Sequence, residues 1–332
     1  MKKIRIAQIG TSIYSHGSQI WNVLTKMTDV FEIVGYAFPE EEREKFPDHM
    51  KFFDGYREMT VEEILSDHTV EAVFVETEEI YLTKYALMVA KAGKHLHMEK
   101  PGGTDPSDFK ELISVLKEKN LIFSTGYMFR FNPKIREAIE KARRGDLGRI
   151  FSVEAQMGCL HDKVWRRWLD AFPDGMMFFL GCHLVDIVYR ILGEPKEVIP
   201  LSASTGKDGI DAVDYGMAVF RYENGVSFVK TTDVEVAGNM RRQVVITGER
   251  GTIEIRPLEE DVPRGKQYAV SRESLLTDDG VRTFTERSED FTRYGGMLMN
   301  FAEMVRGKEN PYSCDYELKL YELILKACGA NK

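Results

Sequence analysis

The stretch IRIAQIGTSIYSHG, residues 4–17, decides the fold of this chain. Its apolar run ends at Gly10, and helical periodicity follows from Ser18 to Met27. A strand that ends in glycine and leads into a helix can present backbone N–H groups and the helix dipole to a pyrophosphate. Because Ser12 replaces the second glycine of the G-x-G-x-x-G pattern, these residues alone leave dinucleotide binding open.

The same alternation of apolar runs and helical patterns continues to residue 125. This alternation is typical of βαβ units and predicts a Rossmann-type parallel sheet. We expect Asp105 or Ser107 to cap the helix that runs to Glu118. The expected strands are 4–9, 31–38, 71–76, 95–98 and 121–125, and the further expected helices are 61–65 and 81–91.

Beyond residue 125 the pattern changes to period-two runs, which indicate antiparallel strands. A hairpin is predicted at Glu223-Asn224-Gly225, because Asn-Gly tolerates the positive φ angles of a tight turn. The expected strands are 151–157, 215–222, 226–236, 242–247 and 252–256, and the expected helices are 132–143, 176–192 and 297–305.

The predicted fold class is therefore α/β, with two domains. Residues 1–125 form a dinucleotide-binding Rossmann domain, and residues 126–332 form an α+β domain that carries the substrate site and a large, open, mostly antiparallel sheet. A length of 332 residues suits two cores better than one.

Composition excludes several classes of protein. Charged residues make up 30% and the net charge is -8, so nucleic-acid binding would need a basic patch that the sequence lacks. Four cysteines without CxxC spacing favour free thiols in a reducing compartment. Without a signal peptide or an apolar stretch of about 20 residues, we expect a cytoplasmic protein that has no membrane partner.

The end of the second strand lacks the acidic residue that would hold an adenosine ribose hydroxyl. Phe38 stands there instead. Glu40 to Glu42 follow, and we expect them to form the exposed start of a helix. The ribose contact is therefore either missing or rebuilt from other residues.

The segment Glu99-Lys100-Pro101 gives a sharper signal. A lysine at the carboxyl end of a parallel strand points into the crevice where such sheets bind ligands. Beside a nicotinamide cation it would lose its proton more easily, and it could hold or deprotonate a hydroxyl while hydride leaves the same carbon. The alternative is an ordinary solvated lysine in a loop.

A second candidate lies in the helix predicted over residues 176–192. Phe179, His183 and Asp186 share one face through their spacing, and His183 suits proton transfer near neutral pH. Asp186 would orient His183 or pair with Arg190. A hydrogen-bonded core histidine is the competing interpretation.

Two further groups of residues have less specific patterns. Cys159 and His161-Asp162 lack the spacing of a known metal motif, so we expect no metal site. The run from Trp165 to Trp168 would line a sugar-sized pocket, or else form an amphipathic helix surface.

Taken together, these segments resemble the glucose–fructose oxidoreductase/inositol dehydrogenase (Gfo/Idh/MocA) family. The resemblance lies in the order and spacing of the motifs along nearly the whole chain. The motifs are the Gly10 turn, Ala90-Lys91-Ala92-Gly93-Lys94-His95, Glu99-Lys100-Pro101, Gly126 to Pro133, Gly145 to Ile150, Gly181 to Asp186, Leu192-Gly193 and Asn300-Phe301 to Asn310-Pro311.

The resemblance implies an NAD- or NADP-dependent oxidoreductase that acts on a sugar, polyol or related hydroxy compound. It implies that Lys100 and His183 flank the reacting carbon, and that a homodimer or homotetramer forms through the open sheet. The cofactor-binding residues that it implies are Gly10, Thr11, Ser12, Ile13, Thr77, Glu99 and Lys100, and the substrate-binding residues are Met128, Arg130, Trp165 and Asp186.

Several positions depart from the family pattern: Ser12, Phe38, Glu78 and Glu79 in place of Pro-Asn, Leu82 in place of a histidine, and Phe179 in place of an aspartate. They keep two alternatives open. One is a non-catalytic member that binds a sugar-like ligand or a partner after losing its cofactor contacts. The other is an enzyme that keeps a tightly held cofactor for elimination or hydrolysis.

Overall fold

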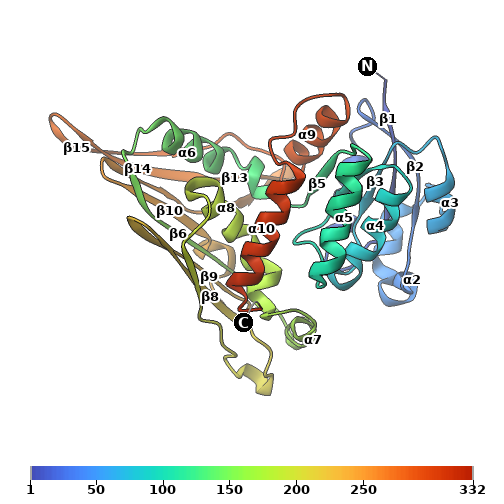
Figure 1. The fold of residues 1–332 in the computed structure, drawn as a ribbon, viewed down its shortest axis with the longest axis horizontal. Helices are drawn as coiled ribbons and strands as arrows, with labels where there is room; N and C mark the ends of the chain where they lie inside the picture. Colours follow the sequence, from blue (N-terminus) through green and yellow to red (C-terminus); the bar gives the residue numbers. More distant parts are fainter. Residues whose placement is uncertain (1, 331–332) are drawn as a thin grey trace. The chain divides into compact units, whose positions relative to one another are not determined.

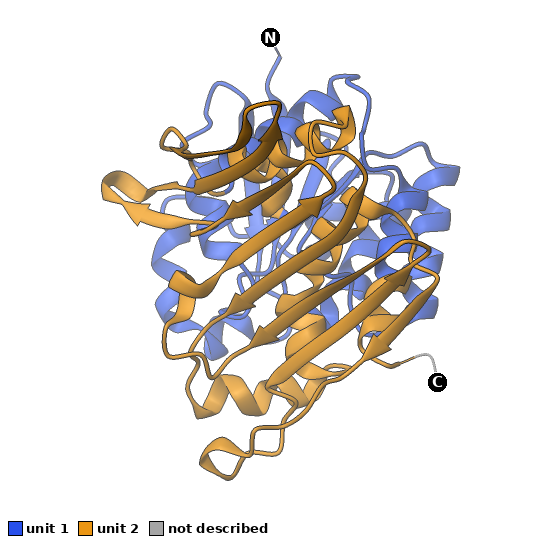
Figure 2. Cartoon of the chain, turned by 90° about the vertical axis from the view of Figure 1, so that its left-hand side faces the viewer, with its two compact units in different colours: residues 1–127, 294–321 blue, residues 128–293, 322–332 orange. Residues whose placement is uncertain are grey.

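The computed structural model describes residues 2–330, which form two compact units. Unit 1 comprises Met1–Tyr127 and Tyr294–Tyr321, and unit 2 comprises Met128–Arg293 and Glu322–Lys332 (Figure 2). This division differs from the predicted one because the segment Tyr294–Tyr321 returns to the first unit.

Unit 1 is built on a five-stranded parallel sheet with the order β2-β1-β3-β4-β5 (Figure 1), as predicted. The chain runs from β1 to one edge, returns, and continues on the other side of β1. Ligands bind beyond the carboxyl ends of the strands at such a reversal. The strands are β1 (Ile4–Ile9), β2 (Phe31–Ala37), β3 (Ala72–Val75), β4 (His95–Met98) and β5 (Phe123–Thr125).

Two helices of unit 1 begin at side-chain caps, Thr60 for α3 and Asp105 for α5. Asp105 accepts hydrogen bonds from the N–H groups of Ser107 and Asp108, which confirms one of the two predicted caps. The helices are α1 (Gly17–Leu24), α2 (Glu42–Lys45), α3 (Val61–Ser66), α4 (Leu82–Lys91), α5 (Pro106–Glu118) and α9 (Gly295–Val305), with 3₁₀ turns at Pro47–Phe53 and Glu79–Tyr81.

Unit 2 contains an eight-stranded sheet with the order β15-β14-β11-β10-β6-β9-β8-β7. Only the β6–β9 pair is parallel among its described pairings, so the predicted mostly antiparallel sheet is confirmed. The strands are β6 (Ile150–Gly158), β7 (Glu197–Pro200), β8 (Tyr215–Tyr222), β9 (Gly225–Thr232), β10 (Gln243–Gly248), β11 (Gly251–Ile255), β14 (Val270–Thr277) and β15 (Gly280–Arg287); β12 (Glu260–Val262) and β13 (Lys266–Tyr268) form a separate pair.

One face of this sheet is covered by helices, as the alternating burial along β6 shows. Val153, Ala155 and Met157 are buried, whereas Ser152 and Glu154 stay partly exposed. Helix α8 packs on β6 and β9, and α6 contacts α8 and β11. The helices are α6 (Pro133–Arg144), α7 (Lys163–Trp168), α8 (Cys182–Leu192) and α10 (Cys314–Ala327), which starts in unit 1; short turns lie at Met128–Phe131, Leu169–Ala171, Lys207–Gly209, Gly238–Arg241 and Pro263–Gly265.

The β8–β9 hairpin forms where the sequence predicts it, but for another reason. Tyr222 pairs with Gly225, and neither Glu223 nor Asn224 between them adopts a positive φ, so that expectation was wrong. A Cβ atom on Gly225 would lie 2.2 Å from the carbonyl oxygen of Phe151. Glycine is needed here for close packing against β6.

Candidate functional site

The glycine turn after β1 is tightly packed against the chain that leaves β3. Gly10 has a φ of 91°, and a Cβ atom on it would lie 2.5 Å from the backbone nitrogen of Thr77. The side-chain amide of Gln8 donates to the carbonyl oxygens of Gly10 (2.9 Å) and Gly17 (3.1 Å). Both ends of the loop are therefore fixed, as a phosphate-binding turn requires.

Part of the loop's donor capacity is used internally. The N–H group of Ser12 donates to the carbonyl oxygen of Glu76 at 3.2 Å, and the Ser15 hydroxyl donates to the same oxygen at 2.8 Å. The N–H groups of Ile13 and Ser15 have no acceptor within residues 2–330. These two donors fit an incoming phosphate.

Glu42 contradicts the expectation of an exposed helix start. Its side chain is 2% exposed, and Oε2 accepts the Thr11 N–H at 2.8 Å. Glu40 and Glu41 adopt left-handed conformations, with φ angles of 56° and 60°, and this bend turns Glu42 inward. Burial raises the pKa of Glu42 to about 8, although the Thr11 N–H opposes the shift.

Phe38, which stands where an acidic residue was expected, belongs to an aromatic cluster. Its ring lies 4.7 Å from Tyr36 and 4.9 Å from Phe53, measured between centroids, and Trp21 packs on the same two residues. This end of β2 is therefore an apolar wall.

Lys100 emerges from β4 and is 1% exposed, so it is not the solvated loop lysine of the alternative interpretation. Its Nζ atom lies 3.8 Å from Oε1 of Glu79 and 3.7 Å from Oε1 of Glu99. The peptide bond from Lys100 to Pro101 is cis. Glu79, one of the departures from the family pattern, thus faces the lysine.

The pKa values of the two carboxyl groups around Lys100 are shifted in opposite directions. Burial raises the pKa of Glu79 well above its ordinary value, against the attraction of Lys100. Burial also acts on Glu99, but His16, whose Nδ1 lies 3.3 Å from Oε2 of Glu99, joins Lys100 in holding the pKa of Glu99 below its usual range. Glu99 is therefore the anionic partner of the lysine, and Glu79 holds its proton more strongly.

Glu76 and His97 extend this buried cluster. Burial raises the pKa of Glu76 and lowers that of His97 to about 4. Nε2 of His97 lies 3.8 Å from Oε1 of Glu76. Burial therefore disfavours the charged form of both groups, as it does for Glu79.

In unit 2, His183 lies in the first turn of α8 and is 1% exposed. The ring of Phe129 meets the imidazole edge-on at 5.2 Å between centroids. A π-helical turn, Met177–Gly181, precedes α8 and interrupts the regular spacing between Phe179 and His183.

Arg130 and Asp186 form a buried ion pair in unit 2. Nε of Arg130 lies 3.1 Å and 3.2 Å from the two carboxylate oxygens of Asp186, and Nη2 lies 2.9 Å from Oδ1. Asp186 therefore forms an ion pair with Arg130, a partner that the helix spacing did not indicate. Met128 begins the same turn as Arg130 and is buried.

Trp165 belongs to an aromatic wall in unit 2. Its ring stacks on His161 at 4.3 Å and lies 5.5 Å from Phe179, which in turn contacts Trp168. Phe179 is 7% exposed, so its phenyl group is part of the apolar packing of this wall. Indole faces of this kind also suit the C–H faces of a sugar.

Cys159 and His161 contact each other, and Asp233 lies beside them. Sγ of Cys159 lies 3.6 Å from Nδ1 of His161, and Asp233 approaches the same nitrogen at 3.8 Å. Within residues 2–330, no group of three His, Cys, Asp or Glu side chains has a geometry that could hold a metal ion.

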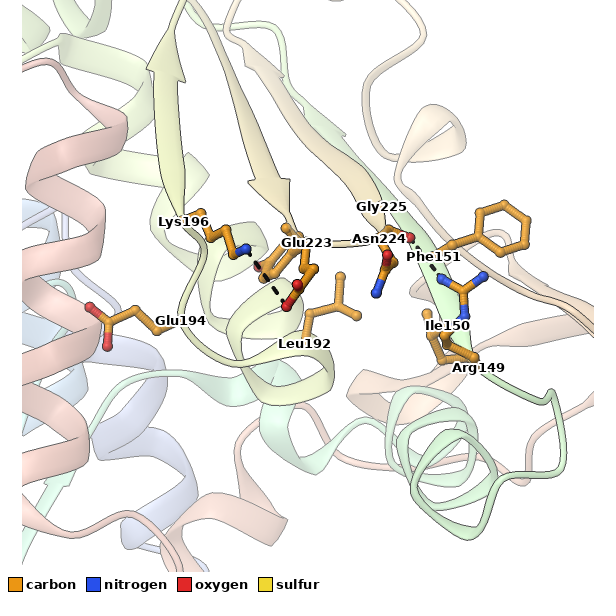
Figure 3. Close-up of a pocket in the computed structure, with 10 residues that line it drawn as sticks. Arg149, Ile150, Phe151, Leu192, Glu194, Lys196, Glu223, Asn224 and Gly225 are labelled. Atoms are coloured by element: carbon orange, nitrogen blue, oxygen red, sulfur yellow. Dashed lines mark hydrogen bonds and ion pairs between the residues drawn. The ribbon is translucent and has the colours of Figure 1, made fainter.

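A hollow of about 340 Å³ opens elsewhere in unit 2, beside the β8–β9 turn (Figure 3). Lys196 pairs with Glu223 at 3.6 Å, and Arg149 donates to the carbonyl oxygen of Asn224 at 2.9 Å. Its further lining residues include Ile150, Phe151, Leu192 and Glu194. No predicted site residue lines it.

Sequence reasoning missed Glu42, Glu76 and His16 as members of the site. Glu76 follows the apolar strand Ala72–Val75 directly, and a carboxylate at the carboxyl end of a buried strand is a signal that would have indicated it. The position of Glu42 depends on two left-handed residues that no simple pattern indicates.

Two family models match the chain. Residues 4–127 match the model described as oxidoreductase family, NAD-binding Rossmann fold. Residues 134–254 match the GFO/IDH/MocA C-terminal domain. The first range ends where unit 1 gives way to unit 2.

Curated relatives are similar over part of their length. The 1,5-anhydro-D-fructose reductase of Ensifer adhaerens is 26% identical over 50% of this chain and 51% of its own. The scyllo-inositol 2-dehydrogenase (NADP(+)) IolW of Bacillus subtilis (strain 168) is 24% identical over 64% of this chain and 59% of its own. The match thus spans little more than half of each relative.

Solved structures share the fold over the whole chain. A levoglucosan dehydrogenase in complex with NADH and levoglucosan has a TM-score of 0.80 at 18% identity and covers 100% of this chain and 98% of its own. An aldose-aldose oxidoreductase from Caulobacter crescentus complexed with glycerol has a TM-score of 0.79 at 19% identity and covers 100% and 99%. The two family models, one matching each unit, show that the chain belongs to the GFO/IDH/MocA family of oxidoreductases.

Proposed function

We propose that this protein is an NAD(P)-dependent dehydrogenase that acts on a CH–OH group of a sugar, a polyol or a related hydroxy compound. One observation carries the proposal: Lys100 is buried at the carboxyl end of β4, within the parallel sheet that matches the family's NAD-binding fold. A lysine in that position is suited to hold a reacting hydroxyl.

The cofactor contacts are proposed from the glycine turn and the loop after β3. Gly10 allows the close approach of a pyrophosphate, and Ile13 and Ser15 supply N–H donors. Thr11, Ser12, Thr77 and Glu99 border the same strand ends. When bound, the nicotinamide coenzyme would accept or supply the hydride.

The chain's own residues would handle the proton. Lys100 would hold the substrate oxygen and take the hydroxyl proton on Nζ as the carbonyl forms, while Glu99 stabilises the resulting ammonium. By the family resemblance, His183 would relay a proton. The Arg130–Asp186 pair would fix the turn before α6, and Met128 and Trp165 would contact the substrate's apolar faces.

A second candidate is a non-catalytic member of the family that binds a sugar-like ligand or a partner. The N–H groups of Thr11 and Ser12, which a dinucleotide would use, are already bonded to Glu42 and to the Glu76 carbonyl. Phe179 supplies no carboxylate. These observations favour a protein that has lost its coenzyme.

Native mass spectrometry separates the two candidates. The purified chain is analysed alone and with NAD(H) or NADP(H), and coenzyme reduction is followed by absorbance with a panel of sugars and polyols. We expect a bound nucleotide and turnover of at least one polyol. Binding of sugar without either nucleotide would favour the non-catalytic candidate. Bound nucleotide that survives purification without net reduction would indicate elimination or hydrolysis.

We further propose that the protein is cytoplasmic and forms a homodimer or homotetramer through the sheet of unit 2. None of the four cysteines forms a disulfide in the described part of the chain, and none of the helices there has the length and apolar character of a membrane span. Val281 is 71% and Leu276 is 54% exposed on the outer strands. Light scattering after size exclusion measures the oligomer, and Val281→Glu should dissociate it if these strands take part.

A further inference from the structure

Glu42 carries a carboxylate oxygen that nothing in the fold satisfies. Oε2 accepts the Thr11 N–H, whereas Oε1 is buried and has no hydrogen-bond partner within residues 2–330. A buried carboxylate oxygen without a donor is costly, and ligand sites are where such groups are retained. This oxygen lies beside the glycine turn and therefore points to a ligand that donates a hydrogen bond there.

The backbone is strained to hold Glu42 in this position. Two consecutive glutamates, Glu40 and Glu41, adopt left-handed conformations that L-residues rarely use. The Glu42 N–H then donates to the carbonyl oxygen of Pro39 at 3.1 Å. Strained residues of this kind cluster at ligand sites because the surrounding contacts hold them there.

The other candidate residues at the end of β2, Phe38 and Glu40, do not offer a carboxylate to the glycine turn. Phe38 is packed among Tyr36 and Phe53. Glu40 is directed to the side chains of Lys84 and Tyr85, with the Tyr85 hydroxyl donating at 2.7 Å. Glu42 is thus the carboxylate at the glycine turn itself.

The charges that face Glu42 are mainly negative or already paired. Glu78 and Glu40 repel it, and Lys45, which is exposed, attracts it. Arg43 is paired with Glu58 and lies over the Phe38 ring. His49 contacts Thr11, with Nδ1 2.8 Å from the Thr11 carbonyl oxygen.

We propose that Glu42 binds the adenosine ribose of the dinucleotide and makes NAD(H) the preferred coenzyme over NADP(H). The ribose 2′-hydroxyl would donate to Oε1, satisfying the orphaned oxygen. A 2′-phosphate has no proton to donate to Oε1 and would bring its charge next to Glu78, with Arg43 held elsewhere. Above pH 8, where Glu42 itself ionises, its carboxylate adds to this repulsion. The inference rests on the proposed function, since it needs a dinucleotide at this turn.

Binding constants of the full-length protein test this without relying on turnover. NADH and NADPH are titrated at about pH 9, where the Glu42 carboxyl is ionised, into wild type, Glu42→Gln and, as a matched control, Glu41→Gln, whose side chain is exposed on the same turn. We expect wild type and Glu41→Gln to bind NADH at least about tenfold more tightly than NADPH. In Glu42→Gln the ratio should fall towards one, with weaker NADH and stronger NADPH binding.

Titration of wild type with ADP-ribose and 2′-phospho-ADP-ribose gives the same comparison without any variant. Equal binding of ADP-ribose and 2′-phospho-ADP-ribose would overturn the inference. A Glu42→Gln variant that gains affinity for both dinucleotides alike would also overturn it, because Glu42 would then only block the turn. If no nucleotide binds to any of these proteins, both the proposed function and the ribose assignment fail. Binding without preference contradicts the ribose assignment alone.

Discussion

At the scale of single residues, Lys100 combines deep burial with two flanking carboxylates, Glu79 and Glu99. If it takes the hydroxyl proton, Lys100→Met should lower kcat by about 10²–10⁴-fold, because general base catalysis contributes that much. Coenzyme binding should persist. Lys91→Met, an exposed lysine of α4, is the control for loss of charge. Steady-state kinetics on any accepted polyol measure the effect, and near-normal turnover in the Lys100 variant would rule out this role.

The buried carboxyl of Glu42 makes a second prediction, concerning stability and pH. Its pKa is about 8 in the folded chain, against an ordinary value of 4.5. Between these pH values the folded state keeps a proton that the unfolded state releases, so this group costs stability as pH rises from 4.5 to 8. Glu42→Gln removes that cost and keeps an acceptor for the Thr11 N–H.

The variant should therefore melt roughly 2–6 °C above wild type at pH 8, and close to wild type at pH 4.5. Scanning calorimetry or thermal fluorescence at both pH values measures the difference. An equal difference at both values would mean that the carboxyl is not protonated in the folded chain.

At the scale of secondary structure, the elements that follow a clear apolar period could be predicted and the others could not. Strand β4 and strand β8 have the predicted bounds, because their side chains face a core. Strand β15 was missed, since all of its side chains are exposed and its pairing with β14 alone holds it in the sheet. The local amino-acid pattern does not reveal which polar strands pair with each other.

Some residues of the candidate site could be predicted from the sequence, and others could not. Lys100 follows a recognisable strand, so its place at the strand end follows from the sequence. The pairing of Arg130 with Asp186 joins residues 56 positions apart and has no local signal. Contacts of this kind arise only when the elements pack together.

The β8–β9 turn gives a prediction for one element. Gly225→Ala should destabilise unit 2 by about 1–3 kcal/mol, because the new Cβ would overlap the Phe151 carbonyl. Asn224→Ala, at the neighbouring loop position, should change stability by less than about 0.5 kcal/mol. Urea unfolding measures both. Similar losses in the two variants would indicate that loop conformation, and not close packing, limits this position.

The Arg130–Asp186 ion pair gives a second prediction at this scale, because it joins the Met128–Phe131 turn to α8. Asp186→Asn leaves a buried guanidinium without its counter-charge and should cost about 3–5 kcal/mol. The double variant Arg130→Met with Asp186→Leu should cost less than the single one, since it removes both charges. Chemical denaturation of wild type and the two variants decides, and a double variant that is less stable than Asp186→Asn would contradict the prediction.

At the scale of the whole molecule, the division of the chain into units depends on tertiary contacts that sequence did not reveal. The segment Tyr294–Tyr321 follows the last strand of unit 2 yet belongs to unit 1. Phe301 packs edge-on against Phe74 at 5.3 Å, and the Tyr321 ring stacks on Phe109 at 4.3 Å. A run of residues with ordinary helical periodicity gives no sign of which core it joins.

The segment Tyr294–Tyr321 allows a test of whether each unit is stabilised independently of the other. Phe301→Ala opens a cavity beside β3 and β4 and should cost about 3–5 kcal/mol. Met299→Ala, 38% exposed on the same helix, is the control. Because local opening follows cooperative units, amide exchange should quicken in Ala72–Val75 and His95–Met98 but not in β8 or β9. Hydrogen–deuterium exchange with mass spectrometry resolves these peptides. Equal acceleration in both sets would mean that the chain opens as one cooperative unit, despite its two cores.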